Sequence, residues 1–147
     1  MSLQTFKATV SRKSGLAVEA ETRGFKVAID EPKELGGTNT GMNPVELLLN
    51  SLGACQAIAI TTFSKKFGVD LEDVRVELEG DLDTDGFLGK SNVRPGFFGI
   101  RFKLYLKTDA PEDKVNKLVD YVQNHCPVGD SILNGVKIEP VRAIIEK

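Results

Sequence analysis

The chain has 147 residues, 41% of them hydrophobic and 27% charged, with a formal net charge of −2. This length fits one domain, so we expect residues 1–147 to form a single domain. The near balance of acidic and basic residues predicts neither a nucleic-acid partner nor a membrane-binding arm, because both need a local excess of basic residues.

The sequence holds two cysteines and one histidine. Two cysteines are too few for the disulfide scaffold of a small secreted protein, and no ligand spacing suggests a metal site or a haem. The N-terminal residues lack the apolar run of a signal peptide, and the apolar stretch over residues 45–60 is interrupted by Asn50, Ser51 and Gln56,. We therefore expect a cytoplasmic protein with reduced thiols and no membrane-spanning segment.

The first third of the chain alternates like short strands, over residues 6–10, 16–20 and 25–29,. Glycine-containing turns separate them, which predicts an antiparallel meander. Residues 31–42, with the sequence EPKELGGTNTGM, then read as a loop that is long enough to be mobile or functional,.

The clearest helix follows. Asn43 is a good N-cap, Pro44 suits the first helical position, and Glu46 completes a capping box, while Gly68 is a fitting end,. The residues between are apolar nearly all round, which predicts a buried helix. We expect a sheet on one side of it and other helices or a second subunit on the other.

The remaining chain reads as strand, loop, strand, two helices and a last strand. Their expected ranges are 74–82, 83–96, 98–107, 109–125, 127–135 and 137–145,. The order βββ–α–ββ–α–α–β places the chain in the α+β class, with antiparallel sheets around a long buried central helix.

The two cysteines are the strongest chemical candidates. Cys55 falls in the middle of the apolar helix, where a cysteine is ordinarily a small buried hydrophobe,. Cys126 precedes Pro127 and should therefore cap a helix, a position that favours a thiolate. The neighbouring His125 either adds a positive charge near this thiol or is simply a solvated residue at a helix end. As a pair, the cysteines suggest redox chemistry, in which a sulfenic acid condenses with a second thiol to a disulfide.

Glu46 lies about two and a half helical turns before Cys55, hence on the opposite face of the same helix. Capping the helix is its ordinary role. A role beside the thiol would require another segment to bring charges to the N-terminal end of the helix.

The stretch NPVELLLNSLGAC at residues 43–55, with HCPV at residues 125–128, resembles the OsmC/Ohr family of osmotically induced and organic hydroperoxide resistance proteins. The resemblance covers essentially the whole chain. It implies an OsmC-like fold and an intertwined homodimer, with the long helices at its centre and the active sites at the subunit interface.

The resemblance also implies roles for individual residues. Cys55 matches the peroxidatic nucleophile, Cys126 matches the resolving cysteine, and Glu46 matches a glutamate that pairs with an arginine. The substrates implied are organic hydroperoxides and, less efficiently, hydrogen peroxide. No metal or bound cofactor is implied, and an external dithiol supplies the electrons.

One departure from the family pattern concerns that arginine. The loop over residues 31–42 has none, and its only base is Lys33, which lacks the planar fork of a guanidinium,. Arg23, Arg94 and Arg101 are the candidates to replace it, and Arg94 is favoured. In this respect the chain resembles the less characterised OsmC-like branch.

The leading prediction is a thiol-dependent peroxidase in which Cys55 attacks the peroxide and Cys126 closes a disulfide. This requires a lowered pKa of Cys55, from a cation or a helix end. The alternative is a non-catalytic small-molecule binding protein. In it the buried helix and the glycine-rich loop line an apolar pocket between subunits, together with Phe87, Phe97 and Phe98. Phe97 and Phe98 are also the predicted substrate-binding residues of the peroxidase, although such aromatics ordinarily pack in cores and loops. A purely structural relative is the third reading.

Overall fold

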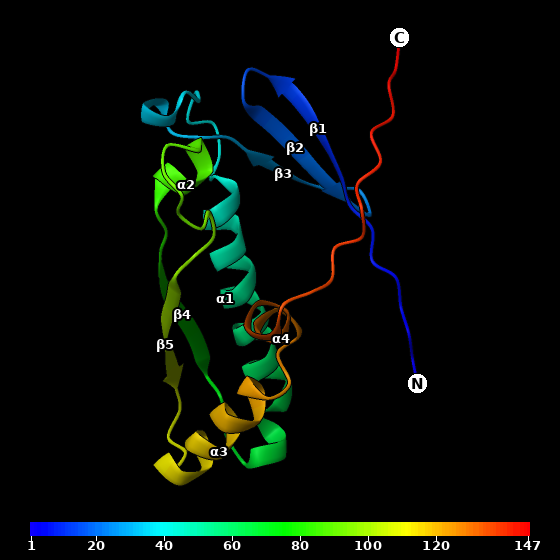
Figure 1. The fold of residues 1–147 in the computed structure, drawn as a ribbon. Coiled ribbons are helices and arrows are strands. Elements are labelled where there is room, and N and C mark those ends of the chain that lie inside the picture. Colours follow the sequence, from blue (N-terminus) through cyan, green and yellow to red (C-terminus); the bar gives the residue numbers. More distant parts are fainter. The chain divides into compact units, whose positions relative to one another are not determined.

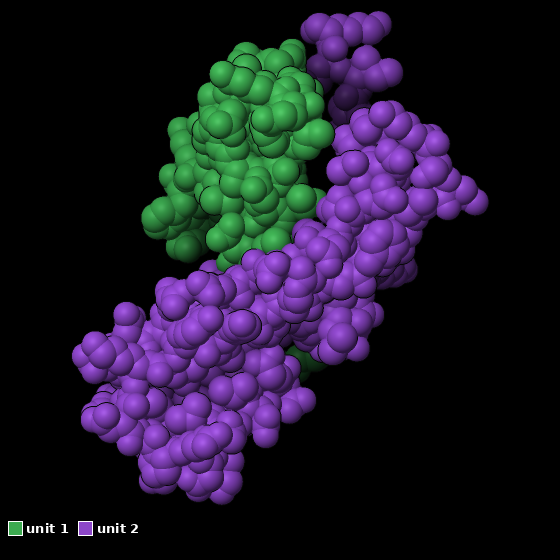
Figure 2. Space-filling view, turned by 90° about the vertical axis from the view of Figure 1, so that its left-hand side faces the viewer, with its two compact units in different colours: residues 1–50 green, residues 51–147 purple.

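The computed structural model describes residues 1–147 as two compact units, residues 1–50 and residues 51–147 (Figure 2). The first unit holds an antiparallel sheet in the order β1-β2-β3, formed by Thr9–Ser14, Ala17–Thr22 and Phe25–Ile29 (Figure 1). Arg23 and Gly24 join β2 to β3, and both have positive φ, as a tight hairpin turn requires,. The predicted meander is confirmed. Its first strand begins later than residue 6, because pairing with β2 starts only at Thr9.

One buried carboxylate closes the glycine-rich loop after β3. Asp30 is 2% exposed, and its oxygens accept five hydrogen bonds, from the N–H groups of Glu31, Thr38 and Thr40 and from both threonine hydroxyls. Gly37 is required beside it, since a side chain there would collide with the carbonyl oxygen of Glu31. The predicted loop is therefore confirmed, but it is not open. Hydrogen bonds from Thr38 and Thr40 to Asp30 hold its second half against its start. It also contains a short 3-10 turn, η1, at Lys33–Leu35.

Removing this carboxylate should weaken the first unit. In Asp30→Ala five donors lose their acceptor, so we expect the melting temperature at pH 7 to fall by about 5 °C or more,. The hydrogen bonds, that of the Thr38 hydroxyl first, hold the pKa of Asp30 well below its usual range. The stabilisation is thus complete above the unfolded pKa of about 3.9 and is lost as the pH falls below it.

Thermal unfolding from pH 7 down to pH 3 tests this prediction. The gap between wild type and Asp30→Ala should narrow below about pH 4. Glu34→Gln, an exposed change in the same loop, is the matched control and should melt with the wild type. Equal melting of Asp30→Ala and wild type at pH 7 would contradict the role given to this carboxylate.

The long helix α1 covers Pro44–Phe63 and starts with the predicted capping box. Asn43 Oδ1 accepts from the N–H of Glu46, and a carboxylate oxygen of Glu46 accepts from the N–H of Asn43, both at 2.9 Å,. A 3-10 turn, η2 at Lys65–Phe67, follows and ends at Gly68, which has left-handed backbone,. By length and composition α1 could cross a bilayer, yet one of its faces packs into a protein core.

The second unit packs that face of α1 and helix α3 (Glu112–Gln123) against a two-stranded antiparallel sheet. The strands are β4 (Asp73–Asp81) and β5 (Gly99–Lys107), which lie side by side (Figure 1). Each alternates half-buried with exposed residues along its length. Gly53 lets α1 approach β4 closely, because a Cβ there would lie 2.7 Å from Cδ1 of Leu78. The core cluster consists of the buried residues Ala59, Ile60, Val69, Leu118 and Val122.

The predicted α+β class with antiparallel sheets is confirmed, and three details differ. The loop after β4 contains a short helix, α2 (Thr84–Leu88), capped by Asp83. Helix α1 is buried on one face only, and Ile58 on another face is 67% exposed.

The third difference is the last strand. No strand forms over residues 137–145, and the chain after α4 (Pro127–Asn134) has no regular element. A strand exists only where a second strand pairs with it, and this segment has no such neighbour within the single chain,.

Candidate functional site

The structure brings the two predicted sulfur atoms together. Cys55 lies on α1 and Cys126 is the N-cap of α4, and their sulfur atoms are 2.9 Å apart, with the Cys126 thiol donating to Cys55. The Cys126 sulfur in turn accepts from the N–H of Gly129 at 3.3 Å, as expected of a capping side chain,. Both cysteines are free thiols. Such a pair is positioned to form a disulfide with little movement of the backbone.

The two thiols differ in their access to solvent. Cys126 is 1% exposed, whereas Cys55 is half-buried. A small molecule from solvent therefore meets the Cys55 sulfur first.

The pKa of Cys55 runs against the sequence expectation. Burial raises it above the ordinary thiol value, and the neighbouring Cys126 thiol raises it further,. The backbone N–H of Val128, in the first turn of α4, acts in the opposite direction but does not outweigh them. A reactive thiolate at Cys55 thus needs a further positive charge near the sulfur.

Glu46 serves the helix start. Its carboxylate caps α1 through the N–H of Asn43, which is the ordinary role that its position predicts. The implied role of this carboxylate toward an arginine stays a prediction.

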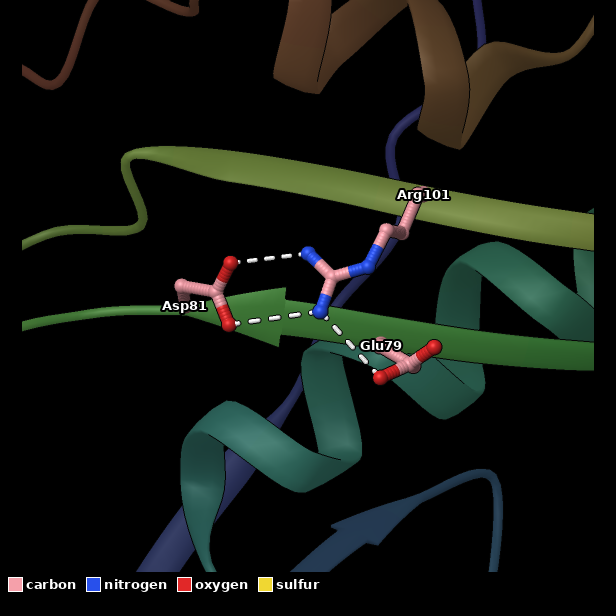
Figure 3. A network of polar contacts seen from close by, with 3 residues as sticks. All are labelled: Glu79, Asp81 and Arg101. Carbon is pink, nitrogen blue, oxygen red and sulfur yellow. Dashed lines mark hydrogen bonds and ion pairs between the residues drawn. The ribbon is translucent and has the colours of Figure 1, made fainter.

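The candidate arginines have different partners. Arg101 on β5 donates to Asp81 at 2.7 Å and to Glu79 at 3.1 Å, so its charge is already neutralised (Figure 3). These two carboxylates, the Asp81 carboxylate first, raise the pKa of the Arg101 guanidinium. The guanidinium of Arg94, by contrast, donates to the carbonyl oxygen of Phe97 at 2.7 Å, a partner without charge.

The other basic candidates lie in the first unit. The guanidinium of Arg23 lies over the ring of Phe25, 5.2 Å from its centroid,. Lys33 begins the 3-10 turn η1. Arg94 therefore remains the favoured replacement for the loop arginine, and its role stays a prediction.

The aromatic candidates have ordinary surroundings in the single chain. The ring of Phe97 packs over Gly80 of β4, where a Cβ would lie 2.7 Å from Cε1 of that ring. Phe98 and Phe87 are exposed. Two surface hollows in the second unit contain none of these rings and neither cysteine. The substrate-binding roles of Phe97 and Phe98 stay predictions.

The N–H groups of Val128 and Gly129 face the sulfurs because Cys126 caps α4, as its place before Pro127 predicted,. One polar neighbour of Cys55 was not predicted from the sequence. Gln56 is a buried amide beside Cys55, and it bonds to Gln123 of α3. His125 stacks on Tyr121, with ring centroids 3.9 Å apart. No group of His, Cys, Asp and Glu residues forms a metal-binding cluster.

A family model described as OsmC-like protein matches residues 37–141. The Uncharacterized protein YmaD of Bacillus subtilis (strain 168) is 28% identical over 127 residues, which cover 81% of this chain and 79% of that protein.

Two crystal structures share the fold. An OsmC-like protein from Mycoplasma pneumoniae aligns with a TM-score of 0.77 and 18% identity, over 88% of each chain. The organic hydroperoxide resistance protein OsmC from Legionella pneumophila aligns with a TM-score of 0.67 and 25% identity, over 90% of this chain and 91% of that one.

Proposed function

Because the chain belongs to the OsmC-like protein family, we propose that it is a thiol-dependent peroxidase that reduces organic hydroperoxides. The observation that carries the proposal is the contact between the Cys55 and Cys126 sulfurs, 2.9 Å apart although they lie on different helices. A Legionella relative named as an organic hydroperoxide resistance protein supports the choice of substrate class.

The proposed reaction starts at Cys55, the more accessible thiol. Its thiolate attacks one peroxide oxygen, the O–O bond breaks, and the alcohol leaves after taking up a proton. Cys55 is then a sulfenic acid. The Cys126 sulfur attacks the Cys55 sulfur, an S–S bond forms, and the hydroxyl leaves as water. An external dithiol reduces the disulfide by thiol–disulfide exchange, so no bound metal or organic cofactor takes part.

Consumption of an organic hydroperoxide such as cumene hydroperoxide, with a dithiol as electron donor, tests this function directly. A peroxidase consumes peroxide and dithiol in equal amounts and shows one fast thiol in alkylation. A non-catalytic binding protein would show two slow, ordinary thiols and no consumption, and that result would end the proposal.

The charge that activates Cys55 is proposed to come from Arg94. Its guanidinium has no carboxylate partner, whereas that of Arg101 is held by Asp81 and Glu79. A cation near the sulfur would offset the burial that raises the pKa of Cys55,.

Replacing Arg94 with glutamine should slow the reaction of Cys55 with hydroperoxide about tenfold at pH 7 and shift its rate profile to higher pH. The shift is upward because, without the cation, burial and the Cys126 thiol keep Cys55 protonated to higher pH. Arg101→Gln is the matched control and should leave the profile in place. Stopped-flow rates between pH 6 and 9 measure both, and identical profiles for wild type and Arg94→Gln would remove Arg94 from the site.

We also propose that the working form is a homodimer. The outer face of α1 leaves Ile58 exposed, and the segment after α4 exposes a series of apolar side chains. A second copy that paired with this segment would turn it into the strand that the sequence predicts and would cover these side chains. The exposed apolar residues of this segment are Val136, Ile138, Val141, Ile144 and Ile145.

A further inference from the structure

A reciprocal amide pair joins the two helical segments that carry the cysteines. Gln56 follows Cys55 on α1, and Gln123 is the last residue of α3, just before the turn to Cys126. Gln123 Nε2 donates to Gln56 Oε1 at 2.8 Å, and Gln56 Nε2 donates to Gln123 Oε1 at 3.4 Å. The two side chains thus satisfy each other in both directions.

Core packing alone does not explain Gln56. It is 1% exposed, and the other buried residues of α1 on this face, Leu52, Ala59 and Ile60, are apolar. Burying an amide costs free energy unless its hydrogen bonds are made, and an apolar side chain here would simply continue the core. A polar pair between two helices with one buried partner fixes their register, because any sliding leaves the buried Gln56 amide unpaired,.

The turn from Gln123 to Cys126 is held firmly to the end of α3. The Asn124 side chain donates to the carbonyl oxygen of Asp120 at 2.9 Å, and the N–H of His125 donates to that of Val122 at 3.0 Å. Because the turn is bonded back onto its helix, a shift of the end of α3 along α1 carries Cys126 with it.

Disulfide formation tolerates little error in the placement of two cysteines. The amide pair and the sulfur pair connect the same two segments, one residue apart on α1 and within one short turn after α3. Hydrogen bonding between the two amides therefore also sets the distance between the two sulfur atoms.

We propose that the Gln56–Gln123 amide pair is a positioning device that holds Cys126 within bonding distance of Cys55 and so favours closure of their disulfide. The inference rests on the proposed function only in making this disulfide a step of the catalytic cycle. Closure itself can be measured without peroxide, since two protein thiols and oxidised glutathione give the protein disulfide and two molecules of reduced glutathione.

The test is the equilibrium constant for this exchange in glutathione buffers. Gln56→Met keeps the approximate volume and removes both hydrogen bonds, and Gln123→Leu removes them at an exposed position that leaves the core side chains in place. We expect each change to lower the equilibrium constant about tenfold or more. Gln123→Glu keeps an acceptor for Gln56 Nε2, so it should restore part of the loss.

A merely structural role would not move this equilibrium, because a general loss of stability affects the reduced and oxidised proteins alike. Ser64→Ala is the matched control, since the buried Ser64 hydroxyl donates to the Thr61 carbonyl oxygen and to neither glutamine. It should leave the constant unchanged. Constants within twofold of wild type for both Gln56→Met and Gln123→Leu would overturn the proposal.

The two proposals fail separately. A wild-type protein that ignores hydroperoxide, with Gln variants that shift the glutathione equilibrium, would refute the peroxidase and uphold the positioning role. Active peroxide turnover with unshifted Gln variants would do the reverse.

Discussion

Replacing Cys55 with serine is expected to abolish hydroperoxide reduction, with a fall in rate of at least about a thousandfold, as for other lost nucleophiles. The serine hydroxyl has nearly the size of the thiol, but it is not nucleophilic toward peroxide at neutral pH. The substitution also removes the sulfur that accepts the hydrogen bond from Cys126. Stopped-flow consumption of cumene hydroperoxide with excess dithiol measures the loss.

The control for this experiment is folding. Cys55 is half-buried on a helix whose core contacts come from other residues, so Cys55→Ser should keep the circular dichroism and melting behaviour of the wild type. A Cys55→Ser protein that consumes hydroperoxide at the wild-type rate would show that this sulfur is not the nucleophile.

Replacing Cys126 with serine is expected to stop the cycle after its first step. Cys55 still attacks the peroxide, but no neighbouring thiol condenses with the sulfenic acid, so this species accumulates. Steady turnover then depends on direct attack by the external dithiol and should fall about a hundredfold, because an intramolecular partner is lost. A dimedone adduct on Cys55, detected by mass spectrometry, identifies the trapped acid.

Serine and alanine at this position separate the capping role from the redox role. Serine is itself a good N-cap and should keep the hydrogen bond from the N–H of Gly129. Alanine cannot accept this bond, so Cys126→Ala should be about 1 kcal/mol less stable than Cys126→Ser,. Both should trap the sulfenic acid equally. Wild-type turnover in Cys126→Ser would mean that the second sulfur has no part in the reaction.

Local signals predicted most elements of the fold. The start of α1 followed from Asn43, Pro44 and Glu46, whose hydrogen bonds depend only on neighbours in the sequence,. The N-cap of α4 followed in the same way from Cys126 and Pro127,. Strands β4 and β5 followed from strict alternation, since each buries one face,.

Two of the failures have non-local causes. The strand expected at residues 137–145 depends on a pairing partner that the pattern of one chain cannot supply,. The closed loop depends on Asp30, whose donors at Thr38 and Thr40 meet it only once the loop has folded back. The short helix α2 was missed although its capping residues, Asp83 and Gly89, are of types that commonly cap helices. Its five residues are too few to show the period of a helix.

For the candidate site too, local features were predicted from sequence patterns and contacts between distant residues were not. The composition identified two candidate thiols, but spacing could not show that they meet, and only the family resemblance predicted their contact. The raised pKa of Cys55 comes from burial and from a thiol distant in sequence, so no local pattern could show it. The pairing of Gln56 with Gln123 was equally hidden, although one amide in an apolar helix was a visible anomaly.

The carboxylate of Asp30 has a practical consequence for anyone who attaches a label or an affinity peptide to this protein. By composition, the glycines and threonines near residue 38 look like the natural insertion point. Added residues there would move the Thr38 and Thr40 hydroxyls away from Asp30 and leave its buried carboxylate without these donors,. The hairpin tip at Gly24 is the better graft site. It is solvent-facing, nothing lies within 4 Å of the position where a side chain would start, and no buried group depends on it,.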